Sequence, residues 1–153
     1  MKLVYAFHVY GDPAPQGSKR HVGNGVMIES SKKVKPWRIA VTEAAMQIRS
    51  ALLDEEIVAD MVFTFLRPTT HYRTGRNAHL LRDNAPARPK SKPDLSKLIR
   101  STEDALSGVL YRDDARITEY GRLLKVYAGE DPDALDVPGA VIRIYTLTDR
   151  TAL

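Results

Sequence analysis

Residues 92–117 read KPDLSKLIRSTEDALSGVLYRDDARI, and their first part predicts an amphipathic helix that is followed by a turn. Small and apolar side chains recur at helical spacing, at Leu95, Leu98, Ile99, Thr102 and Leu106. Asp94 suits the N-cap and Gly108 the C-cap, so we expect the helix to lie between them. The opposite, polar face is expected to carry Lys97, Arg100, Ser101 and Asp104.

Strands are predicted on both sides of this helix. The stretches with strand-like patterns are 1–10, 57–66, 116–127 and 140–147. In the second stretch the odd-numbered side chains are apolar, and Asp60 and Thr64 lie on the other face. Gly121 interrupts the third stretch, where a glycine predicts a β-bulge.

A second helix is predicted upstream, from about Ser31 to Leu53, with Pro36 in its first turn. Residues 11–25 hold two prolines and four glycines and are expected to lack regular structure. The order β, loop, α, β, loop, α, β, β predicts an α/β (α+β) fold, with one small mixed β-sheet and two helices packed on it. A length of 153 residues fits a single domain over residues 1–153.

Composition narrows the class of protein. The chain has no cysteine, which excludes disulfides and thiolate zinc sites and fits the cytoplasm. No apolar run approaches the roughly 20 residues that cross a bilayer, so no membrane association is expected. The net charge of +4 is only a mild indication of a polyanionic partner.

Basic side chains cluster between residues 67 and 92, where seven lysines and arginines face one acid, Asp83. The basic residues are Arg67, Arg73, Arg76, Arg82, Arg88, Lys90 and Lys92. A solvated surface explains most basic runs, but this ratio in a loop of 26 residues favours contacts with phosphates.

Three aspartates are candidates for metal chemistry, because Mg²⁺ prefers carboxylate oxygens and water. Asp94 opens the helix, and Asp113 and Asp114 lie in the turn after it. A helix of this length separates its ends by roughly 18–20 Å. Asp94 and Asp114 can therefore meet only if the following strand returns beside the helix start, or if a second subunit supplies one of them. The alternative is structural: a helix cap and an ordinary turn.

The stretch 92–117 resembles the signature of the RusA family of Holliday-junction resolvases, which is approximately P-D-x-D-N-L-x-K, D-A-L-x-G and D-D-x-Q-I. The stretch GDPAPQGSKR, residues 11–20, also resembles the opening loop of that family. The resemblance implies a RusA-like homodimer that cuts four-way junction DNA with Mg²⁺.

Within this resemblance, Asp94 and Asp114 match acids of the family's metal site, and Asp113 is the neighbour of the second. Arg100 stands where the family has a catalytic lysine, and Asp104 matches the aspartate of D-A-L. Ser96 replaces the second acid of P-D-x-D, and Lys97 replaces the asparagine that follows. The loss of one negative charge and the gain of a positive one are expected to weaken metal binding.

The preferred interpretation is a structure-selective endonuclease that resolves Holliday junctions in DNA recombination and repair. Its catalytic residues would be Asp94, Asp114 and Arg100, and Mg²⁺ would be bound by Asp94, Asp114 and Asp113. The expected DNA contacts are Lys19, Arg20, Arg73, Arg76, Lys97 and Arg100. A junction-binding protein with weak or no catalysis is the first alternative, and a scaffold that does not bind nucleic acid is the second. We expect the endonuclease in the cytoplasm of a bacterial or phage-infected cell, associated with the nucleoid.

Overall fold

The computed structural model describes residues 1–17, 19–21, 27–29 and 32–147. Its strands are β1 (Lys2–Tyr10), β2 (Lys19–His21), β3 (Met27–Glu29), β4 (Ile57–Phe65), β5 (Ile117–Tyr127) and β6 (Gly139–Thr146). Its α-helices are α1 (Val34–Ile48) and α2 (Leu95–Leu106). Three single-turn 3₁₀ helices are η1 (Thr69–His71), η2 (Gly75–Asn77) and η3 (Asp114–Arg116). The predicted order of elements is confirmed.

One helix boundary and one loop differ from the predictions. The helix α1 ends at Ile48, not near Leu53, because the chain turns extended at Arg49. Its predicted cap, Ser31, lies outside the described residues. The prediction that residues 11–25 lack regular structure is wrong at β2, which pairs with β3 in a small antiparallel hairpin.

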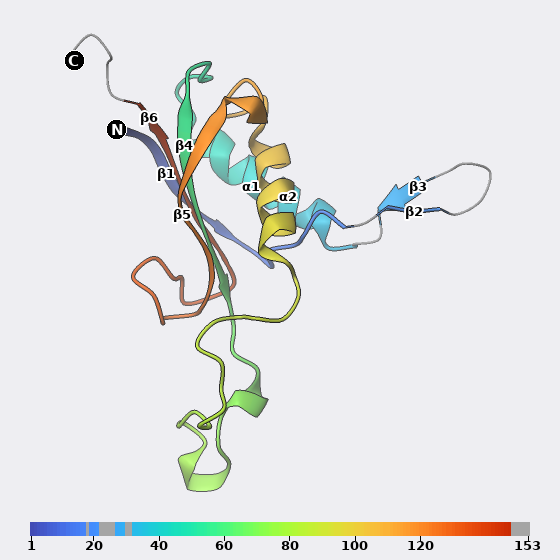
Figure 1. Ribbon diagram of the computed structural model, residues 1–153, viewed down its shortest axis with the longest axis vertical. Helices are drawn as coiled ribbons and strands as arrows, with labels where there is room; N and C mark the ends of the chain where they lie inside the picture. The colour runs from blue at the N-terminus through green and yellow to red at the C-terminus, as the bar shows by residue number, and fades with distance from the viewer. Residues whose placement is uncertain (18, 22–26, 30–31, 148–153) are drawn as a thin grey trace.

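The main sheet is mixed, as predicted, with the strand order β1-β6-β4-β5. Strand β4 pairs in parallel with β5 and antiparallel with β6, which in turn pairs antiparallel with β1. Parallel neighbours need a long connection, and here α2 lies within it. Both helices cover the same face of the sheet (Figure 1). The predicted α/β fold with a mixed sheet and two helices is therefore confirmed.

Strand β4 is buried along almost its whole length. Its odd-numbered residues, from Ile57 to Phe63, pack under the helices in the main core, as the alternation predicts. Val62 packs on the opposite face against the segment that follows β5, through Leu135. The sheet is therefore covered on both faces at β4, which explains why its polar residues Asp60 and Thr64 are buried as well.

The helices are joined by polar contacts inside the core. Trp37 Nε1 of α1 donates a hydrogen bond of 3.1 Å to Thr102 Oγ1 of α2. Ser101, predicted on the exposed polar face of α2, is instead buried. Its hydroxyl donates to the carbonyl oxygen of Ala14 at 2.6 Å, because residues 11–17 cross over this part of the helix. The prediction for Ser101 is wrong because the helical pattern does not show that residues 11–17 pack over this side chain.

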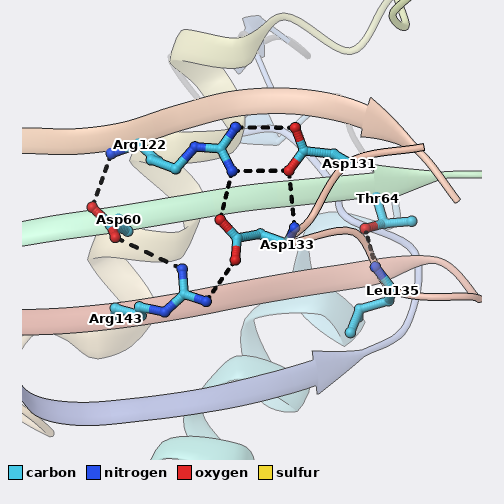
Figure 2. Close-up of polar contacts among 7 residues, drawn as sticks. All are labelled: Asp60, Thr64, Arg122, Asp131, Asp133, Leu135 and Arg143. Carbon is cyan, nitrogen blue, oxygen red and sulfur yellow. Dashed lines mark hydrogen bonds and ion pairs between the residues drawn. The ribbon is translucent and has the colours of Figure 1, made fainter. Parts of the chain in front are cut away.

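The second face of the sheet carries a network of charges, which Figure 2 shows. Asp131 and Asp133 follow β5 and pair with Arg122 at 2.9 and 2.6 Å, and Asp133 also pairs with Arg143 at 2.6 Å. The two guanidinium groups hold the pKa of Asp133 below its ordinary value, and Arg122 does the same for Asp131. This acidic segment is therefore fixed to the sheet by arginines of β5 and β6.

Candidate functional site

Asp94 lies where the long connection after β4 enters α2. It occupies the N-cap position, but its side chain makes no capping hydrogen bond. The carboxylate is about half exposed and lies 3.8 Å from Lys97 Nζ. A carboxylate that is exposed and not used as a cap is free to bind a ligand from solution.

Lys125 of β5 fixes the backbone in front of Asp94. Its Nζ donates hydrogen bonds of 2.9 Å to the carbonyl oxygens of Ser91 and Pro93. Burial lowers the pKa of Lys125, and the charge of Asp94 opposes that shift. No sequence pattern points to Lys125, because only the sheet brings this strand beside the start of α2.

Asp113 and Asp114 have different environments. Asp113 Oδ1 accepts a hydrogen bond of 3.0 Å from the backbone N–H of Ala115, so this side chain caps η3. It also lies 3.6 Å from Arg116. Asp114 opens η3 and is exposed. Of the two, Asp114 has the freer carboxylate.

Glu103 belongs to the same end of α2 as Asp114. The Tyr120 hydroxyl donates a hydrogen bond to Glu103 Oε1. Burial raises the pKa of Glu103, and the nearby charges of Asp114 and Asp104 raise it further. Glu103 and Asp114 are separated by eleven positions in the sequence, and the fold of the turn 107–113 brings them near each other.

The structure does not bring Asp94 and Asp114 together within the chain. Asp94 precedes the first turn of α2, whereas η3 contacts the helix after the chain has turned back at its other end (Figure 1). The twelve residues of α2 span about 18 Å. Among the described residues, no three His, Asp or Glu side chains gather to hold a metal ion. The carboxylates suit Mg²⁺ chemically, but a single chain does not combine them.

Polar residues on α2 connect the two ends. Ser96, Arg100 and Glu103 follow one another at spacings of four and three residues, which places them on neighbouring turns of one face. Ser96 and Arg100 are exposed, as is Lys97. The face between the two acidic ends therefore presents a guanidinium and an ammonium group to solvent.

The basic segment 67–92 projects beyond the end of the sheet (Figure 1). An antiparallel bridge between Tyr72 and Leu81 closes it into an arm. Arg76 is exposed in η2. Arg73 pairs with Asp83 at 3.0 Å, an exposed pair that leaves its charge near solvent. The arm therefore holds its basic residues on a defined backbone.

Arg67 belongs to the basic run but is not among the expected DNA contacts, and its side chain is engaged within the fold. Its side chain is only 4% exposed and pairs with Glu130 at 2.5 Å. The guanidinium also lies 4.0 Å above the ring of Tyr127 and donates to the carbonyl oxygen of Pro86 at 2.8 Å. Arg67 fastens the arm to the sheet and is not available to DNA.

Lys19 and Arg20, the remaining predicted DNA contacts, lie in β2. The structure does not describe where their side chains lie.

Among the residues that the structure describes, no helix is long and apolar enough to cross a membrane.

Comparison with known proteins gives two matches. The family model for endodeoxyribonuclease RusA matches residues 11–137, well over half of the chain. The chain is also 26% identical over 126 residues to the uncharacterized protein YqaN of Bacillus subtilis (strain 168), over 81% of this chain and 88% of that protein. The matched residues include α2, Asp94 and Asp114 at its two ends, and the basic arm. The chain therefore belongs to the RusA endodeoxyribonuclease family.

Proposed function

We propose that this protein is a Mg²⁺-dependent endonuclease that resolves four-way DNA junctions as a symmetric homodimer. The family is one of Holliday-junction-resolving endonucleases, which act in DNA recombination. The observation that carries the proposal is the position of Asp94 and Asp114 at opposite ends of α2, joined by a face that carries Lys97 and Arg100.

The separation of the two aspartates suggests that each active site is shared between protomers. Asp94 of one protomer would combine with Asp114 of the partner subunit, with Glu103 beside the latter. In a dimer with two-fold symmetry this arrangement occurs twice. A four-way junction has near two-fold symmetry itself, so two equivalent sites match two equivalent strands.

The residues of this chain divide the work between binding and hydrolysis. Arg73 and Arg76 of the arm, and Lys19 and Arg20 of β2, would contact the DNA backbone. Lys97 and Arg100 would orient the phosphate near Asp94. Asp94 and Asp114 would hold Mg²⁺, with Asp113 beside them as a cap of η3. When bound, Mg²⁺ supplies an activated water and stabilises negative charge on the phosphate.

A mixed dimer tests the shared site. Asp94→Asn and Asp114→Asn chains, each with a different affinity tag, are co-expressed, and the doubly tagged dimer is isolated. If the sites are shared, one site of the mixed dimer carries both substitutions and the other carries neither. The mixed dimer should then cut one strand of a labelled junction in Mg²⁺, although neither homodimeric variant cuts.

The outcomes separate two questions. A mixed dimer that is as inactive as both homodimers shows that each site lies within one protomer. If both homodimeric variants cut normally, the site assignment itself is wrong. Light scattering of the parent should give twice the 17.1 kDa of the chain, and a strict monomer in the presence of junction DNA would reject the dimer.

Ser96 and Lys97 favour a second candidate, a junction-binding protein with weak or no catalysis. Ser96 replaces an acid of the family pattern, and Lys97 lies 3.8 Å from Asp94. Cleavage of a synthetic junction by the parent protein in Mg²⁺ decides between the two candidates. Salt-dependent DNA binding separates both from a scaffold that does not bind nucleic acid. Either candidate acts on DNA, and we expect it at the nucleoid in the cytoplasm.

A further inference from the structure

A pocket of about 400 Å³ lies at the base of the arm, between its two chain segments and the end of the sheet. Its lining includes Phe65, Tyr127 and Pro93. The volume falls in the usual range for small-molecule sites, roughly 300–1,000 Å³. Pro93 directly precedes Asp94, so the pocket adjoins one of the two acidic positions proposed for the active site.

The lining combines aromatic and proline rings with positively charged side chains. Arg82, Lys90 and Lys92 supply the charges, and Asn84 adds an amide that can donate and accept hydrogen bonds. Among the described residues that line the pocket, none is acidic. An apolar floor, an amide and three cations suit a flat heteroaromatic ring that carries a phosphate, which is the chemistry of a nucleotide.

The pocket is built on fixed parts of the fold. Tyr127 is 6% exposed, with the Arg67 guanidinium over one side of its ring and His71 against it in an edge-to-face contact. Lys125 holds the carbonyl oxygens of Ser91 and Pro93 on the other side. These contacts fix the residues that line the cavity on both sides.

We propose that this pocket receives one unstacked nucleotide of the DNA, next to the phosphate that is cut. The inference rests on the proposed nuclease function and adds a source of its selectivity. A base inside a duplex is stacked and paired, and extruding it costs free energy, least where the base is already unpaired. Because a base that is already unpaired or unstacked enters such a pocket at the lowest cost, the pocket would favour a distorted crossover over a continuous duplex.

Two alanines of the arm provide a matched pair of variants. Ala85 lines the pocket and is partly buried, whereas Ala87 is exposed and does not line it. Ala85→Trp fills the cavity without changing a charge, and Ala87→Trp adds the same side chain to the surface. Asn84→Ala, at an exposed position that lines the pocket, removes an amide with little risk to the fold.

The experiment places 2-aminopurine at single positions around the crossover of a four-way junction and uses EDTA to prevent cutting. The parent and Ala87→Trp should raise the emission severalfold at one position per strand, because the base leaves the stack. Ala85→Trp should bind the junction within twofold of the parent but give no rise, and its cleavage in Mg²⁺ should fall at least tenfold. Asn84→Ala should reduce the rise.

A parent protein that binds and cuts the junction without any rise in emission would overturn the pocket and leave the nuclease function standing. The same holds if Ala85→Trp gives the emission and cleavage of Ala87→Trp. If the parent gives the rise but never cuts, the nuclease function fails while the pocket is supported. Equal circular dichroism and unfolding midpoints for the two tryptophan variants show that the comparison concerns the pocket and not the fold.

Discussion

Asp60 Oδ1 of β4 accepts a hydrogen bond of 2.8 Å from the backbone N–H of Arg122 in β5. The contact lies where three residues of β4, from Ala59 to Met61, pair against four of β5, from Tyr120 to Leu123. The extra residue forms a β-bulge, and the buried carboxylate satisfies the N–H that the bulge leaves without its usual partner. The bulge predicted at Gly121 is thereby confirmed.

Gly121→Ala should be destabilising, because a Cβ at this position would lie 2.2 Å from Asp60 Oδ1. The carboxylate must then move away from Arg122, and we expect a loss of about 1–3 kcal/mol in the free energy of unfolding. Urea unfolding of both single variants and the double variant checks this. In an Asp60→Ala background the same substitution should cost much less, because the clash is gone. Equal costs in the two backgrounds would show that Asp60 is not the cause.

Asp133→Asn should lower the free energy of unfolding by about 2–3 kcal/mol, because it leaves Arg122 and Arg143 with fewer acidic partners. Asp136→Asn is the control in the same segment, where the side chain is exposed, and it should change stability by less than about 0.5 kcal/mol. Urea unfolding at pH 7 compares them. Similar losses for both variants would contradict the role of the network.

The pH dependence of stability follows from the same charges. The pKa of Asp131 and of Asp133 is lowered in the folded state, so the unfolded chain binds more protons as the pH falls. Their contribution is fully present above about pH 4, the ordinary carboxyl value, and is lost as the pH falls through the folded-state pKa. Asp133→Asn should therefore unfold with a weaker pH dependence than the parent between about pH 4 and pH 2. An unchanged slope would exclude Asp133 as a contributor.

Two arginines of the arm should behave in opposite ways. Charge reversal at exposed Arg76, Arg76→Glu, should weaken binding to all DNA structures and reduce the slope of log affinity against log salt by about 1. Its unfolding should stay within about 0.5 kcal/mol of the parent. Arg67→Ala should instead cost about 2–4 kcal/mol of stability, because Glu130 loses its buried partner. Salt titrations of binding and urea unfolding measure both effects, and DNA affinity independent of salt would reject phosphate contacts.

Ser96→Asp restores the acid of the family pattern and should lower the Mg²⁺ concentration needed for half-maximal cleavage. The added negative charge beside Asp94 is the reason, and Lys97 is expected to blunt the gain by pairing with it. A Mg²⁺ titration of junction cleavage compares the parent with Ser96→Asp and with Ser96→Ala as the control. Cleavage by Ser96→Asp alone, with an inactive parent, would favour the junction-binding protein as the description of the natural chain.

The sequence by itself determined most of the elements, because hydrophobic periodicity is local. The odd-numbered apolar residues of β4, the stripe of α2 and the glycine at the bulge each follow from residues close together in the chain. The sequence also indicated the family, because the motif in residues 92–117 is contiguous. The error at Ser101 arose where a distant segment, residues 11–17, covers the helix.

Only the tertiary structure decided which charges are free and which belong to the fold. Arg67 and Arg76 lie in one basic run, yet Arg67 is buried against Glu130 and Tyr127 while Arg76 faces solvent. The turn after α2 brings Asp114 close enough for its charge to raise the pKa of Glu103. The sheet brings Lys125 within hydrogen-bond distance of the carbonyl oxygen of Pro93, the residue before Asp94. Charge interactions depend on distance and burial, and both are set by contacts between residues that are far apart in the sequence.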